Sequence, residues 1–583
     1  MKEKENITKK SANANLLGLL KPYKLWIALL VVLTVLGNGL NLLVPKIIAS
    51  AIDSYAQGNF VLLNVVFEFF VVAVVIFILT YLQNVVQTYS SERVARDLRN
   101  KISAKISTQD YMYIERVTPG KLLTNLTSDV DAVKNFVSLA IAAIISSVFL
   151  IIGASILLIT INWQLALAVL AIMPMVATVF IIVFSKVQIL FKKSQETIDW
   201  LNKVINESIL GSALIRILNS QQYEYEKFLE ANTQAKEIGF SILRLFATLI
   251  PVIGFATNIA TLVILVLGGR FVIAGTLTLG EFTAFNNYLL ILIFPLIILG
   301  FMSTIIAQAT ASYQRILDVL GAEEKKSSGR LKADLCDDID VKNICLSFGE
   351  KTILKNVSFR IKAGTKTAII GPTAAGKTQL LYLLSGLILP TSGAIEYGGK
   401  NIDIYDKEIF YRQIGIVFQD SIVFNLTLRE NIAFSNMVED MDLEKAIATA
   451  ELQDLIGSLP KKLDTIVSER GTSLSGGQKQ RIMLTRALTL NPKVLLLDDF
   501  TARLDVATEQ KILKNVQKNY PGITLISITQ NIAPVEDYDQ IILLMEGELL
   551  AAGTHQELLR SCPEYVQIYN SQKSTNEYEL PTK

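Results

Sequence analysis

Six long stretches without a charged side chain lie within the first 314 residues, and they constrain the fold more than any other feature. Each is longer than the roughly 20 residues that a helix needs to cross the hydrocarbon core of a bilayer. The sequence therefore predicts an α-helical transmembrane domain with six spans, at residues 25–45, 69–91, 136–161, 164–185, 245–269 and 282–314.

The third and fourth spans come from one continuous uncharged stretch, which we divide at Asn162 and Trp163. A polar amide followed by an aromatic residue that favours membrane interfaces indicates a tight turn at the membrane surface. The first span has full length and no small-residue cleavage pattern, so we expect it to be retained rather than removed as a signal peptide.

The distribution of lysine and arginine predicts the orientation of the spans. The segments 93–134 and 186–244 each carry eight Lys or Arg residues, whereas the other three connections contain Lys46, none and Arg270. Because positively charged segments stay in the cytoplasm, we expect both long segments and both termini there, as the lysine-rich start at residues 1–10 also indicates.

The two long segments are rich in helix formers, which predicts helices that leave the membrane, turn and return. We expect a short helix at each turn, within residues 118–133 and 206–218, able to rest on another domain. The alternative is a solvated hairpin.

Composition limits the remaining possibilities. Hydrophobic residues make up 51% of the chain and charged residues 19%, with a mean hydropathy of +0.41, which suits a membrane domain joined to a soluble one. Cys336, Cys345 and Cys562 form no C-x-x-C pair, so we expect neither a disulfide framework nor a zinc site. The net charge of +2, without a basic patch, gives no indication of nucleic-acid binding.

From about residue 325 the pattern becomes that of a soluble α/β domain. We expect the transmembrane domain at 1–320, a linker at 321–338, an α/β P-loop domain with a helical subdomain at 339–575, and a tail at 576–583. The segment 365–384 reads as strand, loop and helix, and its loop fits G-x-x-x-x-G-K-[ST]. In such a loop, N–H groups cradle phosphates, the lysine reaches the terminal phosphates and the last hydroxyl ligates Mg²⁺. The loop is Gly371, Pro372, Thr373, Ala374, Ala375, Gly376, Lys377 and Thr378.

Two further stretches strengthen this interpretation. VLLLDD, at 494–499, reads as a buried strand that ends in Asp498, and a carboxylate in this place holds Mg²⁺ in nucleotide-hydrolysing domains. LSGGQ, at 474–478, has two glycines that leave room for a phosphate, although a Ser-Gly-Gly sequence alone is most often only a turn. The LSGGQ residues are Leu474, Ser475, Gly476, Gly477 and Gln478.

Six spans followed by a P-loop, Gln419 in IGIVFQD, LSGGQ and LLLDD resemble the ATP-binding cassette (ABC) exporters that carry one membrane domain and one nucleotide domain per chain. The resemblance covers essentially the whole chain and points to the multidrug and lipid exporter branch. LSGGQ between the two nucleotide motifs is highly specific to this superfamily. The resemblance implies a cell-membrane dimer that holds two ATP molecules, each between the P-loop of one chain and the LSGGQ signature of the other.

The resemblance also implies roles for single residues. Phe348 would stack on adenine, the P-loop would hold phosphates, and Thr378, Gln419 and Asp498 would ligate or sense Mg²⁺. The signature would complete the partner's site, and Asp505 would belong to the loop that links the two sites. The tips of the long segments would be coupling helices that transmit closure of the nucleotide domains to the spans.

Two positions depart from the family pattern. The magnesium aspartate is normally followed by Glu, but Asp499 is one methylene shorter, which withdraws the carboxylate by roughly 1.5 Å from the attacking water. The histidine that normally contacts the γ-phosphate is replaced by Gln530. The chain has one histidine, His555, which lies beyond that strand in a polar setting typical of a surface or packing residue. We therefore expect a degenerate catalytic site.

Three milder departures accompany these. Ala374 replaces a usual glycine in the P-loop and restricts a backbone that needs φ > 0, Gln379 replaces a small hydroxyl residue, and Arg503 enters the inter-site loop.

The signature is intact, whereas the chain's own site has lost its base and its γ-phosphate contact. This asymmetry predicts a heterodimer with a second, non-identical chain that keeps both Glu and His. The alternatives are a homodimeric exporter with slow ATPase activity and an ATP-gated channel or regulatory membrane protein. Spans with amide and hydroxyl groups but no charge favour small hydrophobic or amphipathic substrates, although such groups also bridge helices.

Overall fold

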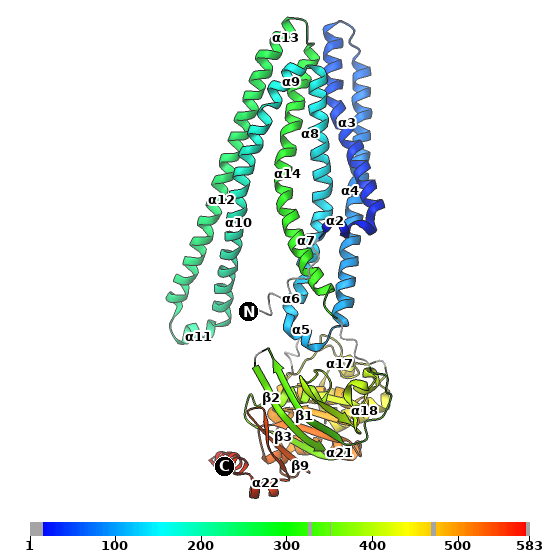
Figure 1. Cartoon of the computed structure of the whole chain (residues 1–583), viewed down its shortest axis with the longest axis vertical. Coiled ribbons are helices and arrows are strands. Elements are labelled where there is room, and N and C mark those ends of the chain that lie inside the picture. Colours follow the sequence, from blue (N-terminus) through cyan, green and yellow to red (C-terminus); the bar gives the residue numbers. More distant parts are fainter. Residues whose placement is uncertain (1–14, 324–328, 350, 436, 468–473, 579–583) are drawn as a thin grey trace. The chain divides into compact units, whose positions relative to one another are not determined.

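The computed structural model describes residues 15–323, 329–349, 351–435, 437–467 and 474–578 (Figure 1). The lysine-rich start, the middle of the predicted linker and the end of the predicted tail lie outside the described residues. The chain divides into two compact units: Met1–Thr108 with Val117–Glu323, and Gln109–Arg116 with Glu324–Lys583.

In its described residues the first unit is built from helices, and six of its helical stretches are long and apolar enough to cross a membrane. Each contains one of the six predicted spans, so the prediction of six membrane-spanning helices is confirmed. The helices are α2 (Leu16–Leu19), α3 (Lys24–Ala56), α4 (Leu62–Ser107), α6 (Pro119–Thr124), α7 (Val130–Asn135), α8 (Ile141–Ile161), α9 (Trp163–Leu170), α10 (Ile172–Leu210), α11 (Ser212–Ile217), α12 (Gln221–Val263), α13 (Gly269–Ile273) and α14 (Leu279–Leu320).

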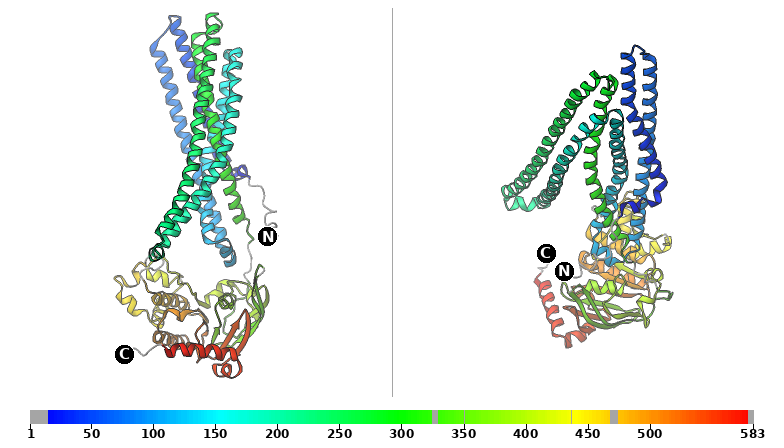
Figure 2. Two further views of the ribbon diagram at one scale, coloured as in Figure 1. Left: turned by 90° about the vertical axis from the view of Figure 1, so that its left-hand side faces the viewer. Right: turned by 45° about the horizontal axis from the view of Figure 1, so that its top comes forward.

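Several of these helices continue far beyond the length of a membrane span. α4 has 46 residues and α12 has 43, and both extend into the charged segments where we predicted helices that leave the membrane. α10 and α12 run as a pair that leans away from α3, α4, α8 and α14 towards its tip at α11 (Figures 1 and 2). α11 lies within the predicted tip at 206–218.

The predicted turn between the third and fourth spans is confirmed. α8 ends at Ile161, and Asn162 leaves the helical conformation with φ −154° and ψ 108°. Its side-chain Oδ1 accepts a hydrogen bond from the Leu165 N–H at 3.0 Å, so Asn162 caps the helix that begins at Trp163.

One prediction about the connections was wrong. The first tip helix is α5 (Tyr111–Val117), not a helix within 118–133, where the chain already returns through α6, a π-helical stretch (Asn125–Asp129) and α7. Lys46 and Arg270, which we expected on the external side, lie within α3 and α13, and their side of the membrane stays a prediction. A lysine does not interrupt a helix, and its long stem lets the charge reach a polar region from within the helix.

Polar contacts tie α3 to α14 at two levels. At one end, Asp53 accepts hydrogen bonds from the Thr278 hydroxyl at 2.7 Å and from the Gly280 N–H at 2.8 Å. Gly280 permits this close approach, since a Cβ there would lie 2.0 Å from the Ala49 carbonyl oxygen. Further along, the buried Tyr288 hydroxyl donates to the Leu42 carbonyl at 2.8 Å. These contacts fix the register of the two helices.

The second unit contains two sheets. One is four-stranded and antiparallel, in the order β2-β1-β4-β5, and the other is six-stranded and mostly parallel, in the order β10-β9-β3-β8-β7-β6. This is the α/β domain that the sequence predicted. The strands are β1 (Ile339–Phe348), β2 (Lys351–Ile361), β3 (Lys366–Ile370), β4 (Ser392–Tyr397), β5 (Lys400–Asn401), β6 (Ile414–Val417), β7 (Val494–Asp498), β8 (Thr524–Thr529), β9 (Gln540–Met545) and β10 (Glu548–Gly553).

The helices of this unit cover its sheets and form the helical subdomain. They are α15 (Lys377–Leu384), α16 (Lys407–Arg412), α17 (Leu428–Ile432), α18 (Asp440–Thr449), α19 (Gln453–Ser458), α20 (Gly476–Leu488), α21 (Val506–Asn519), α22 (His555–Ser561) and α23 (Pro563–Tyr578).

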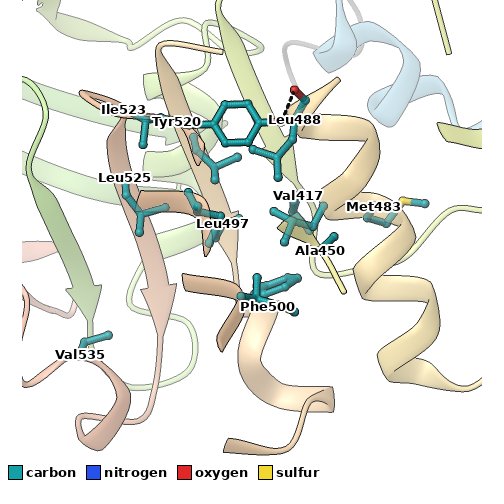
Figure 3. Close-up of a cluster of buried hydrophobic side chains, with 14 of the residues drawn as sticks. Val417, Ala450, Met483, Leu488, Leu497, Phe500, Tyr520, Ile523, Leu525 and Val535 are labelled. Atoms are coloured by element: carbon teal, nitrogen blue, oxygen red, sulfur yellow. Dashed lines mark hydrogen bonds between the residues drawn. The ribbon is translucent and has the colours of Figure 1, made fainter. Parts of the chain in front are cut away.

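A buried apolar cluster joins the six-stranded sheet to these helices (Figure 3). Val417 of β6 and Leu497 of β7 face Leu488 of α20, and Phe500, only 1% exposed, lies two residues after Asp498, the last residue of β7. The cluster anchors the ends of β7 and α20, and so positions both the acidic pair and the signature.

Candidate functional site

The P-loop connects β3 to α15 through a backbone that only small residues allow. Gly371 has φ +155° and Gly376 has φ +91°. A Cβ at Gly371 would lie 2.0 Å from the Leu544 carbonyl oxygen, and one at Gly376 would lie 2.7 Å from the side chain of Leu354. Both glycines are therefore required by space as well as by conformation. Ala374 also has a positive φ, +66°, so this loop carries a strained alanine where we anticipated one.

Lys377 closes the loop on itself. Its Nζ donates hydrogen bonds to the carbonyl oxygens of Gly371 at 2.7 Å and Pro372 at 2.8 Å. Burial lowers the pKa of Lys377, while the nearby carboxylates of Asp499 and Asp498 act in the opposite direction. The ammonium group is thus held at the centre of a ring of loop atoms, where a phosphate would meet it.

Asp498 lies beside the end of the P-loop at the carboxyl edge of the sheet. The Thr378 hydroxyl donates to its Oδ1 at 3.3 Å. The residue is 1% exposed, and its Oδ2 has no hydrogen-bond partner among the described residues. Burial raises the pKa of Asp498, and the neighbouring Asp499 acts in the same direction. A buried carboxylate oxygen without a partner, next to a hydroxyl, fits Mg²⁺, which takes few protein ligands and keeps water and phosphate oxygens.

Asp499 and Gln530, the two degenerate positions, follow neighbouring strands. Asp499 has φ +47°, an unusual conformation for a residue with a side chain, and its N–H donates to the Ile528 carbonyl of β8 at 3.0 Å. Gln530 directly follows β8, which lies between β3 and β7 in the sheet. Its side chain is exposed, and its carbonyl oxygen accepts a hydrogen bond from Gln572 at 2.7 Å. Both residues therefore lie at the edge that carries the P-loop and Asp498.

The signature stretch (474–478) forms the start of α20 through a capping box. The Ser475 hydroxyl accepts from the Gln478 N–H at 3.3 Å, and the Gln478 side chain accepts from the Ser475 N–H at 2.9 Å. Leu474 packs on the apolar cluster of Figure 3. Gly476 and Gly477 lie against Arg503, and a Cβ at Gly477 would be 2.9 Å from the Arg503 carbonyl oxygen. The signature is thus a rigid helix start.

The remaining predicted residues occupy separate positions around these groups. Asp505 caps α21, because its carboxylate accepts the Thr508 N–H at 2.9 Å, and this bond lowers the pKa of Asp505. Phe348 ends β1 and packs partly on the core of its unit. Gln419 is exposed just beyond β6, and Gln379 is half-buried in α15. The hydrogen bonds thus join Thr378 to Asp498 in one group and Ser475 to Gln478 in another.

The structure also shows contacts that sequence reasoning missed. α5 is part of the second unit although the chain on either side of it is not. The Tyr111 ring lies 5.6 Å from that of Tyr382 on α15, and Tyr382 lies 5.9 Å from Phe418, the residue before Gln419. Met112 packs on the core of the same unit. Only the tyrosines and methionine in YMYIERV could have indicated a docking face.

His555 is a packing residue, as its sequence context indicated. Its Nδ1 lies 2.6 Å from the Tyr565 hydroxyl, and its ring contacts that of Tyr569 at 5.1 Å between centroids. This histidine is the first residue of α22, which follows β10, whereas the P-loop follows β3.

Comparison with known proteins agrees with these arrangements. Residues 27–296 match the ABC transporter transmembrane region, and residues 354–502 match the ABC transporter domain. The chain is 32% identical to the uncharacterized ABC transporter ATP-binding protein YfiB of Bacillus subtilis (strain 168), over 95% of this chain and 98% of that protein. It is 29% identical to the probable multidrug resistance ABC transporter ATP-binding/permease protein YheI of the same strain, over 95% and 96% of the two chains.

A solved structure has the same fold. A bacterial Atm1-family ABC exporter with ATP bound superposes with a TM-score of 0.78 at 22% sequence identity, covering 96% of this chain and 99% of that one. The P-loop, the acidic pair and the capped signature therefore lie in a chain of this architecture. The chain belongs to the ABC transporter family, as a half-transporter in which the transmembrane region and the ATPase domain are fused in one polypeptide.

Proposed function

We propose that this chain is one half of a dimeric ATP-driven exporter of the plasma membrane. In this proposal it binds ATP at a catalytically impaired site of its own and lends its signature to the hydrolytic site of a non-identical partner chain. The termini and the ATPase domain lie in the cytoplasm, as the basic residues between the spans support.

The observation that carries the proposal is the contrast between the two halves of the site. The signature has a complete capping box, whereas the position of the general base holds the short Asp499 and the position of the γ-phosphate contact holds Gln530. A displacement of about 1 Å at a reacting centre costs about 10²-fold in rate. A chain of this kind gains most from a partner that keeps Glu and His.

The residues of this chain would divide the work of holding ATP. The P-loop N–H groups and Lys377 would bind the phosphates, Phe348 would stack on the adenine, and Gln419 would approach the metal from its exposed loop. Thr378 and Asp498 would hold Mg²⁺, which neutralises phosphate charge when bound. None of these roles needs a working base, so nucleotide binding and turnover can be separated.

The spans support a hydrophobic or amphipathic substrate, because the predicted membrane segments contain amide and hydroxyl groups but no charge. The name of the similar YheI, a probable multidrug resistance protein, agrees with this substrate class.

The test measures the ATPase activity of three samples. The first is the purified chain alone, and the second is the chain with a candidate partner that has Glu and His. The third is the variant of this chain that carries both Asp499→Glu and Gln530→His. We expect the chain alone to be nearly inactive, the pair to be active, and the double variant to gain about tenfold or more. Brisk hydrolysis by the chain alone that Asp499→Asn abolishes would show a homodimer with Asp499 as a working base.

A further inference from the structure

Two cavities lie along one face of α3, and nothing described so far uses them. The first, which we call the polar cavity, has a volume of about 470 Å³ and lies between α3, α8 and α14. The second, the apolar cavity, has a volume of about 680 Å³ and lies between α3 and α4. Both volumes fall in the range of small-molecule sites. Ile48 lines both cavities.

The residues of α3 that line the cavities form one stripe. Asn41, Val44, Pro45 and Ile48 line the polar cavity, and Ile47, Ile48, Ala51, Ile52 and Tyr55 line the apolar cavity. These positions follow the three- and four-residue spacing of a single helix face. Asn41 and Tyr55 are 14 residues apart in sequence, which corresponds to about 20 Å along a helix. The stripe is therefore long enough to hold a head group and part of an extended fatty-acyl chain.

The polar cavity offers hydrogen-bonding groups without charge. Asn41 of α3 and Asn287 of α14 both line it. Within the described residues, neither side-chain amide forms a hydrogen bond. Ser147, only 1% exposed, adds a hydroxyl group from α8. Ser146 also lines the cavity, but its hydroxyl donates to the Asn38 side chain at 3.0 Å.

Two prolines lie in the helix segments that line the polar cavity. Pro45 lies inside α3 and Pro295 inside α14, and both line the cavity. Because proline has no N–H, the carbonyl four residues earlier loses its usual helical donor. Those carbonyls belong to Asn41 and Ile291, which line the same cavity. A ligand with hydroxyl or amide N–H groups would complement the side-chain oxygens of Asn41 and Asn287, and these two carbonyls are further acceptors on the same helix segments.

None of the described residues that line either cavity is charged. Asp53, the nearest acidic residue of α3, is already engaged by Thr278 and Gly280 of the α14 start. Lys46 of α3 lines neither cavity. A charged head group would be desolvated here without a counter-ion, which disfavours its binding. An uncharged head group would incur no such cost.

We infer that this face of α3 binds an uncharged amphiphile whose hydroxyl- or amide-bearing head occupies the polar cavity and whose single long chain lies in the apolar cavity. Phe69, Phe70 and Ala73 of α4 would contact the chain. The inference rests on the proposed export function and specifies its substrate class.

The probe for this inference is a monoacylglycerol with a chain of about 16 carbons and a photoreactive diazirine near the chain end. It is added to the full-length protein in nanodiscs, and labelled residues are located by peptide mass spectrometry. We expect labelling at the apolar cavity, around Phe69 and Phe70. Unlabelled monoacylglycerol should compete, and palmitate or hexadecyltrimethylammonium should compete at least tenfold more weakly.

Matched variants separate the two cavities from the general lipid surface. Asn287→Leu removes a polar-cavity amide and should weaken probe binding about three- to tenfold, the range for one hydrogen bond. Asn286→Leu is its control, because the Asn286 side-chain amide donates to the Phe282 carbonyl and does not line the cavity. Ala73→Phe fills the apolar cavity and should abolish labelling there, whereas Val71→Phe, exposed outside the cavity, should not.

Labelling that neither Asn287→Leu nor Ala73→Phe changes would overturn the inference, because the probe would then lie on the lipid-facing surface. Equal competition by palmitate would overturn the uncharged head. Probe binding requires no ATP turnover, so the two proposals fail separately. A pair that hydrolyses ATP and exports another compound without binding the probe contradicts only the inference, and a pair without ATP turnover contradicts only the proposed function.

Discussion

Ala374 adopts a left-handed backbone conformation, with φ +66°, in the middle of the P-loop. A residue with a Cβ pays roughly 1 kcal/mol for this conformation, and glycine does not. We expect Ala374→Gly to raise the melting temperature of the ATPase unit by about 1–3 °C. Ala375→Gly is the control: Ala375 is 2% exposed and is not among the positive-φ residues, so the same change should lower the melting temperature. Calorimetry of the full chain measures both, and equal shifts would contradict the argument.

Glu509 is a second residue whose environment makes a prediction. It is 3% exposed on α21, its Oε1 has no partner among the described residues, and burial raises its pKa from 4.5 to about 7. The raised pKa means that the folded state favours the protonated acid. Stability is therefore full below pH 4.5 and falls as the pH rises through about 7, because the unfolded chain ionises more easily.

Glu509→Gln should remove this loss. We expect the variant to be more stable than the wild type at pH 8, by roughly 2 kcal/mol, and similar to it at pH 5. Glu444→Gln, a change at an exposed position of α18, is the control and should leave the pH profile unaltered. Thermal unfolding between pH 5 and 8 gives the profile, and parallel curves for wild type and Glu509→Gln would contradict the assignment.

At the scale of elements, α5 makes the sharpest prediction, because it docks through a few aromatic side chains. Tyr111→Ala removes the ring contact with Tyr382 on the P-loop helix. We expect basal ATPase activity of the assembled pair to change less than about twofold, while substrate stimulation of that activity is lost. Tyr111→Phe keeps the ring and should retain stimulation. If Tyr111→Ala retained stimulation as well, α5 would have no coupling role.

The elements differ in how far sequence could predict them. Spans follow from hydropathy, and the turn at Asn162 follows from a side chain that caps its own helix, so both depend on neighbouring residues alone. α5 depends on Tyr382 and Phe418, which lie far along the chain, and so no local pattern fixed its position. α3 continues beyond Lys46 because a charged residue ends an uncharged run without ending a helix.

The candidate site shows the same division. The P-loop, Asp498 and the signature were predictable because each is a local motif with a fixed geometry. The hydrogen-bond partners of Lys377 and the unpartnered Oδ2 of Asp498 were not, because they arise where separate strands meet at one edge of the sheet.

At the scale of the whole transporter, the proposed heterodimer predicts that its two sites respond unequally to matched changes. In the pair with a competent partner, Ser475→Ala in this chain removes a hydroxyl from the productive site and breaks the capping box. We expect it to lower ATP turnover about 10²-fold. Asp499→Asn in this chain should change turnover less than about threefold. Steady-state ATPase measurements of the two variants decide the matter, and equal losses would indicate two equivalent sites.

The placement of α5 has a practical consequence for expression of the ATPase domain by itself. A fragment that begins at the linker leaves out residues 109–116, although these residues belong to the same compact unit. Tyr382 would then lose its ring contact with Tyr111, and the core of the unit would lose Met112, so that apolar surface would face water. Such a fragment should self-associate, and a synthetic peptide of residues 109–116 added in trans should return it to a monomer in size-exclusion chromatography.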